Sequence, residues 1–158
     1  MDTTTFLEAL AAEKTVKIKI IAERADILPL YASEGAAGAD VFACIDKEVV
    51  IQPGSIQLIS TGLKMEIPRG YEVQIRPRSG LAAKFGVTVL NTPGTIDSDY
   101  RGDVRVCLIN HGVADFIVTP LMRIAQIVVA PVVTAQFILT QQLESTQRGA
   151  GGFGHTGT

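Results

Sequence analysis

The sequence predicts a single all-β domain, arranged as a sandwich, a jelly roll or a small closed barrel. Ile, Val and Thr make up 45 of the 158 residues, and branched side chains fit a pleated strand better than a helical turn. Short apolar runs recur along the chain, and Gly, Asn or Pro-Gly stands at most of the joints between them. A chain of this length suits one domain and buries roughly 70% of the surface that its unfolded form exposes.

Hydrophobic patterning places the individual strands. From Thr15 to Ile20 apolar residues alternate with lysines, which indicates a half-buried strand. The run 127–133 is apolar on both faces, so we expect it in the centre of the fold or against another subunit. Further strands are expected at residues 49–51, 56–59, 63–67, 71–75, 87–90, 104–110, 116–119, 124–129 and 132–139.

Composition excludes several classes of protein. The formal net charge of −2 gives no overall attraction to nucleic acid or to an anionic membrane, so phosphate binding would depend on locally placed arginines. Neither a signal peptide nor an apolar run long enough to span a membrane is expected. Cys44 and Cys107 do not combine with His111 or His155 into a zinc pattern, so both thiols are expected to be buried and reduced. We therefore expect a soluble protein of the cytoplasm.

One short helix is expected at residues 79–85, a segment rich in Ala and Leu. Ser79 is the expected N-cap and Gly86 the residue that ends the helix. A helix start beside the Arg78 guanidinium can bind an anion, because its free amides and the cation both favour negative charge. An ordinary capped connection between strands is the alternative, and Arg78 alone does not decide between the two.

A cluster of polar residues, N-T-P-G-T-I-D-S-D-Y-R-G-D, lies between two apolar runs at residues 91–103. Its Pro-Gly and Arg-Gly dipeptides predict a β-hairpin that exposes Asp97, Ser98, Asp99 and Tyr100 on a rigid two-stranded support. A purely structural loop is the alternative, because Asp, Ser, Asn and Gly favour turns through local hydrogen bonds. A calcium loop is excluded, since a cation and an alkyl group would stand at ligand positions.

The two ends of the chain differ from the domain at 15–143. Residues 1–14 are expected to form either a weak amphipathic helix or a frayed extension, to which we assign no function. Residues 144–158 lose the apolar periodicity and finish in a glycine-rich sequence. A dinucleotide site is excluded there, because its G-x-G-x-x-G lacks a preceding strand and a following helix. A mobile strap that offers amides to phosphates and an aromatic face to a base is favoured over a plain disordered tail.

Five stretches of the sequence are together similar to the dUTPases, the trimeric dUTP pyrophosphatases. They occur in the order found in that family: A-G-A-D-V (37–41), P-R-S-G-L-A (77–82), the 91–103 hairpin, R-I-A-Q-I (123–127) and R-G-A-G-G-F-G-H-T-G (148–157). Val41 stands where the family more often has Leu, and His155 occupies a variable position. Neither departure affects the chemistry.

The resemblance implies an all-β, jelly-roll-like (β-clip) distorted barrel with one short internal helix and a mobile Gly-rich C-terminal tail. It implies a homotrimer in which each of three active sites is assembled from several subunits. The implied reaction is the Mg²⁺-dependent hydrolysis of dUTP to dUMP and pyrophosphate, which keeps uracil out of DNA and supplies dUMP for thymidylate synthesis. No nucleic acid or membrane is expected as a partner.

The resemblance also implies roles for individual residues. Asp97 matches the general base that activates the water attacking the α-phosphorus, and Tyr100 matches the residue that excludes a 2′-hydroxyl. Asp40 matches the acid that holds Mg²⁺, through water, with the triphosphate as main ligand. The other substrate contacts match phosphate-binding positions (Arg78, Ser79, Gly80, Gln126, Arg148, Thr156), uracil-binding positions (Asn91, Gly94, Thr95, Ile96, with Phe153 stacking on the base) and positions near the substrate (Arg105, Gly154).

Three other functions compete with this reading. A dCTP deaminase is the nearest, since the resemblance places that class on the same trimeric fold, but the hairpin Asp and Tyr and the complete glycine-rich tail favour the pyrophosphatase. A non-catalytic, nucleotide-sensing trimer is the second. An OB-type nucleic-acid binder is disfavoured by the acidic balance and by the lack of interleaved basic and aromatic residues.

Overall fold

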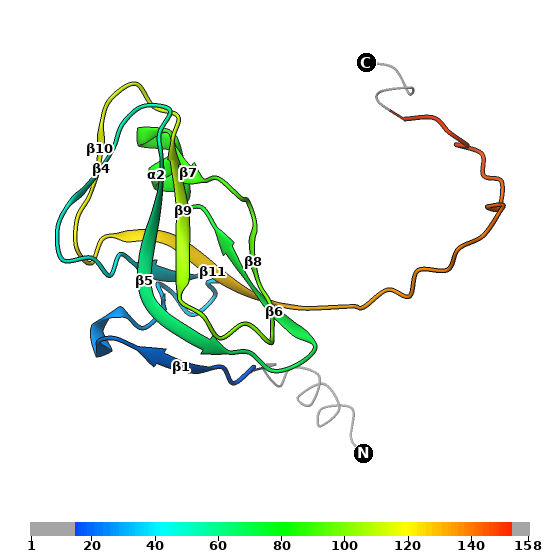
Figure 1. Ribbon diagram of the computed structural model, residues 1–158, viewed down its shortest axis with the longest axis horizontal. Helices are drawn as coiled ribbons and strands as arrows, with labels where there is room; N and C mark the ends of the chain where they lie inside the picture. The colour runs from blue at the N-terminus through cyan, green and yellow to red at the C-terminus, as the bar shows by residue number, and fades with distance from the viewer. Residues whose placement is uncertain (1–14, 153–158) are drawn as a thin grey trace.

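The computed structural model describes residues 15–152, so the N-terminal helix expected at 1–14 lies outside the described residues. β-Strands dominate the described part, together with one short α-helix and one 3₁₀ turn (Figure 1). The elements, in order, are β1 (Lys19–Ala22), η1 (Ala25–Ile27), β2 (Leu30–Tyr31), β3 (Ala39–Phe42), β4 (Val49–Ile51), β5 (Ile56–Glu66), β6 (Tyr71–Arg76), α2 (Ser79–Phe85), β7 (Val87–Val89), β8 (Gly94–Ile96), β9 (Val104–Asn110), β10 (Phe116–Val118) and β11 (Arg123–Pro131).

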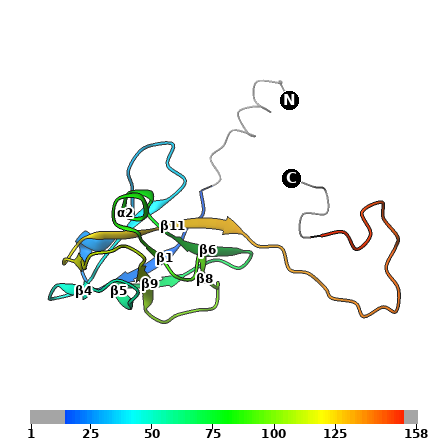
Figure 2. The same cartoon turned by 90° about the horizontal axis from the view of Figure 1, so that it is seen from above.

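Antiparallel pairing organises these strands into three sheets within residues 15–152. A four-stranded sheet has the order β1-β5-β9-β7, a five-stranded sheet the order β2-β3-β11-β6-β8, and β10 pairs with β4. The two larger sheets form layers whose strands cross (Figures 1 and 2). The all-β prediction with one short helix is confirmed. The sheets of the described chain are open, however, so the strands do not close into a barrel.

The core fills the space between the two larger sheets. Strand alternation supplies it: in β6, Val73 and Ile75 are buried, and the residues between them face the other way. The buried cluster takes residues from both sheets, including Val41 and Ile127 on one side and Leu63 and Leu108 on the other. One face of the five-stranded sheet therefore packs on the core. The other face carries Asp40, Gln74 and Gln126 as well as the apolar Val128, and it remains available for a site.

A glycine inside β5 marks a bulge rather than a strand end. The sequence predicts separate strands at 56–59 and 63–67, whereas the structure shows one continuous strand. Gly62 has a φ of 66°, and the pairing with β9 shifts between Ser60 and Leu63. The buried Thr61 hydroxyl donates a 2.7 Å hydrogen bond to the Val104 carbonyl and bridges the irregularity. Glycine adopts this left-handed conformation without a Cβ penalty, so the strand bends and continues.

β11 is the third of five strands, so residues 127–131 of the run 127–133 lie in the centre of the sheet, which is one of the two predicted placements. Val132 and Val133 lie beyond the strand and are exposed. The strand predicted at 132–139 is wrong for the single chain, because β11 ends at Pro131. The described residues after it leave the body of the molecule as an extended segment (Figures 1 and 2). Val133 is 93% exposed and Phe137 94% exposed. Apolar patterning favours a strand there, but a strand needs a partner strand. The Val132 amide donates a 2.8 Å hydrogen bond to the Gly70 carbonyl, but within residues 15–152 the segment pairs with no strand.

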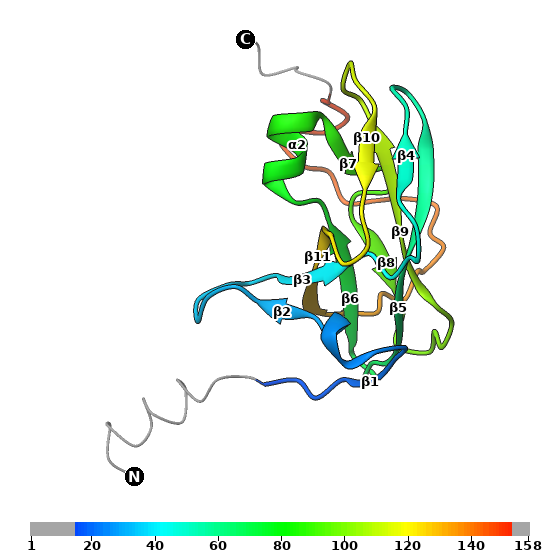
Figure 3. The ribbon, with the colours of Figure 1, turned by 90° about the vertical axis from the view of Figure 1, so that its left-hand side faces the viewer.

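A buried asparagine ties the small β4–β10 sheet to β9. Asn110 is fully buried, and its Nδ2 donates 2.8 Å hydrogen bonds to the carbonyls of Ile51 and Ala114. Its Oδ1 accepts a 2.8 Å hydrogen bond from the Gly112 amide. Figure 3 shows the pair of strands that this side chain anchors, β4 and β10, beside β9.

Within residues 15–152 no helix is long and apolar enough to cross a membrane.

Candidate active site

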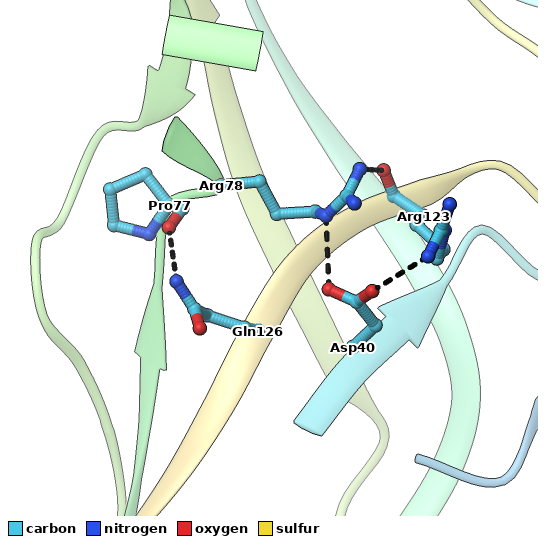
Figure 4. Close-up of polar contacts among 5 residues, drawn as sticks. All are labelled: Asp40, Pro77, Arg78, Arg123 and Gln126. Carbon is cyan, nitrogen blue, oxygen red and sulfur yellow. Dashed lines mark hydrogen bonds and ion pairs between the residues drawn. The ribbon is translucent and has the colours of Figure 1, made fainter. Parts of the chain in front are cut away.

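Three charged side chains meet where β3, β11 and the start of α2 come together (Figure 4). Asp40 lies between two guanidinium groups: Arg78 Nε donates to its Oδ1 at 2.9 Å, and Arg123 Nη1 donates to its Oδ2 at 3.2 Å. Arg78 Nη1 also donates to the Arg123 carbonyl at 3.2 Å. The Asp40 side chain is only 14% exposed. Two cations share one carboxylate, so the cluster keeps a surplus positive charge that favours an anion.

A β-bulge aims these side chains to one side of the sheet. Asp40 pairs with Gln126 across β3 and β11, and the register shifts between Arg123 and Ala125. In a regular strand, residues three apart point to opposite faces. The bulge buries the adjacent Ile124 and Ala125 together and leaves Arg123 on the same face as Gln126. The sheet irregularity thus creates the cluster.

Gln126 is held beside the cluster by two neighbours. Its Nε2 donates a 2.9 Å hydrogen bond to the Pro77 carbonyl (Figure 4). Its side-chain oxygen and carbons pack against Gly38, where an added Cβ would lie 3.0 Å from the Gln126 Cδ and overlap its oxygen. Gly38 is therefore required by close packing. Sequence reasoning did not assign it a role, although it lies inside the A-G-A-D-V motif.

The start of α2 differs from its prediction. Ser79 is the first helical residue rather than the N-cap, the N-cap position belongs to Arg78, and no side chain caps the helix. The physical reason is that the Arg78 side chain bonds to Asp40 and to Arg123, and its extended backbone leads directly into the helix. Gly86 ends the helix with a φ of 69°, as predicted. Ser79 and Gly80 are exposed at the mouth of a cleft of about 400 Å³, hereafter the arginine cleft, which is lined by Ala32, Ala36, Ala37, Gly38, Asp40, Arg78, Ser79, Gly80, Arg123 and Gln126.

The 91–103 segment is more than a hairpin loop. β7 and β9 pair as predicted, with Val89 opposite Leu108. Between them, however, the chain crosses to the other sheet, and β8 pairs with β6. The prediction of a loop on a two-stranded support is therefore wrong for its first half, because alternation buries Ile96 and Gly94 in the five-stranded sheet. Asp97 follows β8 directly and is exposed, so its carboxylate projects from the end of a paired strand.

Tyr100 is fixed in the second half of this segment. Its hydroxyl donates a 3.0 Å hydrogen bond to the Asp103 carbonyl, and its ring packs on Gly102. The Arg105 guanidinium lies 3.8 Å from the Asp103 carboxylate. These groups border a second cleft of about 320 Å³, hereafter the hairpin cleft, which is lined by Leu58, Ile75, Asn91, Gly94, Thr95, Ile96, Asp97, Tyr100, Asp103, Val104 and Arg105.

The predicted site residues thus fall into two groups. The arginine cleft gathers Asp40, Arg78, Ser79, Gly80 and Gln126. The hairpin cleft gathers the other predicted residues of the body, which are Asn91, Gly94, Thr95, Ile96, Asp97, Tyr100 and Arg105, and the two clefts have no lining residue in common. Arg148 lines neither of them, and its Nε donates to the Gly151 carbonyl at 2.8 Å. Phe153, Gly154 and Thr156 lie outside the described residues.

Sequence reasoning also assigned no role to Arg123. The residue stands at the head of the R-I-A-Q-I motif, but alternation alone would put it on the opposite face from Gln126. The signal that was missed is the pair of adjacent small or apolar residues, Ile124 and Ala125, both of which the bulge buries. A bulge of this kind is visible only when the partner strand is in place.

The described residues offer few side chains that could together hold a metal ion. Within residues 15–152 no group of three or more His, Cys, Asp or Glu side chains is arranged to hold a metal ion. Cys44 and Cys107 are free and half-buried rather than fully buried as predicted. Burial raises the pKa of the Cys44 thiol, and the Glu23 carboxylate that accepts its hydrogen bond raises it further. Both effects disfavour the thiolate, so this thiol is a weak nucleophile and a weak metal ligand.

The described chain is thus an all-β protein with one cleft of surplus positive charge and a second cleft bordered by an exposed carboxylate. Comparison with known proteins gives the family. The dUTPase family model matches residues 24–157. The deoxyuridine 5′-triphosphate nucleotidohydrolase of Chlamydia pneumoniae is 61% identical over 131 residues, covering 82% of this chain and 90% of that protein. The chain belongs to the dUTPase family, which confirms the resemblance.

Other relatives agree with this placement. The deoxyuridine 5′-triphosphate nucleotidohydrolase of Syntrophotalea carbinolica is 53% identical over 143 residues, with 90% of this chain and 97% of that protein covered. Among solved structures, a dUTPase of Staphylococcus bacteriophage 80alpha with dUpNHpp superposes with a TM-score of 0.80 over 91% of this chain and 100% of its own. At 22% identity that structure supports the fold alone.

Proposed function

We propose that this protein hydrolyses dUTP to dUMP and pyrophosphate. The observation that carries the proposal is that the motif residues line two clefts. One cleft has a surplus of positive charge, and the other has an exposed carboxylate and a fixed tyrosine. Relatives that share 53% to 61% of their aligned residues with this chain are named for the same reaction. Through that reaction the protein keeps uracil out of DNA and supplies dUMP for thymidylate synthesis in the cytoplasm.

Asp97 is the general base in this proposal. Its carboxylate is exposed at the end of β8, whose pairing with β6 fixes the backbone beneath it. A carboxylate accepts a proton at neutral pH, so it can orient a water and deprotonate it as the water attacks the α-phosphorus. Little covalent chemistry is required of the protein in phosphoryl transfer, and positioning of this water is the main task.

The arginine cleft binds the triphosphate. Arg78, the exposed Ser79 and Gly80 at the start of α2, and the Gln126 amide supply donors and charge to the phosphate oxygens. Asp40 would hold Mg²⁺ through water, with the triphosphate as the main ligand. Among the described residues that line the arginine cleft, Asp40 is the one carboxylate, which suits this arrangement because Mg²⁺ keeps several waters and uses few protein oxygens. When bound, Mg²⁺ supplies charge neutralisation to the phosphates.

The hairpin cleft selects the nucleoside. Asn91 and the backbone around Gly94, Thr95 and Ile96 read the uracil edge, and a close wall there excludes the methyl group of thymine. The Tyr100 ring, held by Gly102 and by the Asp103 carbonyl, lies against the deoxyribose and leaves no room for a 2′-hydroxyl. Arg105 stands at the rim of the same cleft and contributes charge near the substrate.

The active site is completed between subunits of a homotrimer. Supporting this, the phosphate-binding and base-reading residues of one chain line separate clefts. The apolar segment after β11 is exposed and has no strand partner among the described residues, as expected of a part that packs on a neighbour. We propose that residues 144–158 form a strap that closes over the site, with Arg148 and Thr156 on the phosphates, Phe153 on uracil and Gly154 between them.

A substrate panel tests the proposed reaction. We expect pyrophosphate release from dUTP with Mg²⁺, and little from UTP, dTTP or dCTP. Ammonia release from dCTP without pyrophosphate from dUTP would indicate a deaminase instead. Binding of dUTP without any turnover would indicate a nucleotide sensor.

A truncation tests the proposed strap. Removal of residues 148–158 should leave the fold intact and greatly reduce turnover, and unchanged kcat and KM would refute the strap.

Mixed subunits test whether sites are shared. Arg78→Ala removes the proposed phosphate-binding arginine of one cleft and Asp97→Asn removes the proposed base of the other, so each variant alone should be inactive. Unfolded together and reassembled in equal amounts, the two variants should recover about a quarter of the wild-type activity, since a shared site then has one chance in four of combining two intact halves. A mixture that stays inactive after reassembly would show that each site is built within one chain.

A further inference from the structure

We propose that Arg123 is a positioning residue that keeps Arg78 available for phosphate by sharing the Asp40 carboxylate. This inference rests on the proposed assignment of the arginine cleft to phosphates. Arg123 is not itself required to touch the substrate. Its task is to hold the carboxylate when Arg78 turns toward an anion.

The geometry assigns the two arginines unequal positions. Arg78 is 27% exposed and Arg123 is 49% exposed, and each bonds to a different oxygen of Asp40. Arg123 also fixes Arg78 through its backbone, because its carbonyl accepts a hydrogen bond from Arg78 Nη1 (Figure 4). The more buried Arg78 therefore has two anchors, and both belong to residues on neighbouring strands of the sheet.

Charge balance explains why the second arginine is needed. With both cations present, one carboxylate neutralises only one of them, and the cluster attracts an anion. Without Arg123, Asp40 and Arg78 would form a closed pair with no surplus charge. An anion would then have to break that pair and leave a carboxylate that is 14% exposed without a partner, which is costly. Arg123 removes this cost because it remains on Asp40.

A double-mutant cycle on anion binding tests the proposal. The probe is inorganic tripolyphosphate, measured by calorimetry without Mg²⁺ at about 0.15 M salt, where long-range charge effects are screened. Arg123→Gln should weaken binding roughly threefold to fivefold, in keeping with a partly exposed charge pair. Arg123→Lys should restore most of the loss. In an Asp40→Asn background, the same Arg123→Gln change should alter binding by less than about twofold, since no carboxylate remains to capture Arg78.

Each outcome has a definite reading. An equal loss from Arg123→Gln in both backgrounds would mean that Arg123 binds the anion itself, and the proposal would be wrong. No loss in the wild-type background would equally overturn it. Arg69→Gln, which removes the same charge outside the arginine cleft, is the matched control and should leave binding unchanged. In steady-state kinetics with dUTP, Arg123→Gln should raise KM and leave kcat nearly constant. Absence of dUTP turnover in the wild type would count against the proposed function, while tripolyphosphate binding still tests Arg123.

Discussion

Replacing Gly38 with Ala tests whether Gln126 is held in place for the substrate. The new Cβ would lie 3.0 Å from the Gln126 Cδ and 3.3 Å from its Cγ, and would overlap the side-chain oxygen. Because these atoms form the end of a flexible side chain, Gln126 can swing away and lose its 2.9 Å hydrogen bond to the Pro77 carbonyl. The cost in stability is then about one hydrogen bond, about 1 kcal/mol, or a Tm lower by about 2–4 °C.

The functional cost should be larger than the structural one. A donor to a charged phosphate is worth about 1.5 kcal/mol, so KM for dUTP should rise roughly tenfold when Gln126 is displaced. Steady-state kinetics and thermal unfolding measure the two effects separately. Gly35→Ala is the matched control from the same loop, since a Cβ there meets no atom within 4 Å. A KM within about twofold of the wild type would refute the reasoning, because Gln126 would then contribute nothing to binding.

Three further changes test other parts of the structure. Gly102→Ala places a Cβ 2.6 Å from the Tyr100 Cζ, so the ring must tilt, and the preference for dUTP over UTP should fall. An unchanged ratio of kcat/KM for dUTP to kcat/KM for UTP would contradict the role of Tyr100. Asn110→Ala removes three hydrogen bonds of a buried side chain and should lower the free energy of unfolding by about 3 kcal/mol in a urea titration. A loss below about 1 kcal/mol would contradict this expectation. Glu23→Gln should lower the raised pKa of Cys44 and speed the alkylation of this thiol at about pH 8, with Cys107 as internal reference. If Cys44 were alkylated at the same rate in the variant and in the wild type, the carboxylate would have no influence on the thiol.

Patterning alone predicted most strands of the core. β4 and β9 have the predicted bounds, and β6, β7 and β10 agree within one residue at each end. These strands are short, alternate clearly and are bounded by turn residues, so local signals suffice. No strand was predicted at β2, β3 or β8. β2 has only two residues, and β8 lies in the polar 91–103 stretch that was expected to be a loop. The pairing of all three strands is decided by the rest of the five-stranded sheet.

Long-range contacts account for the remaining differences. The glycine at 62 was read as a strand end, whereas the pairing of β5 with β9 absorbs it as a bulge. The apolar run at 132–139 was predicted to be a strand, yet it has no partner strand in the part of the chain that the structure describes. Likewise, motif resemblance named Asp40, Arg78 and Gln126 but not Arg123, because the bulge that turns Arg123 toward them depends on register rather than on sequence spacing.

Asp97→Asn is the most direct test of the proposed chemistry. The substitution removes the base but changes the size of the side chain very little, so the hairpin cleft should still bind substrate. We expect dUpNHpp to bind with nearly the wild-type affinity, while pyrophosphate release from dUTP falls by about 10² to 10⁴, the usual contribution of a positioned base. Turnover at the wild-type rate would contradict the assignment of Asp97 as the general base and, with it, the mechanism proposed for this protein.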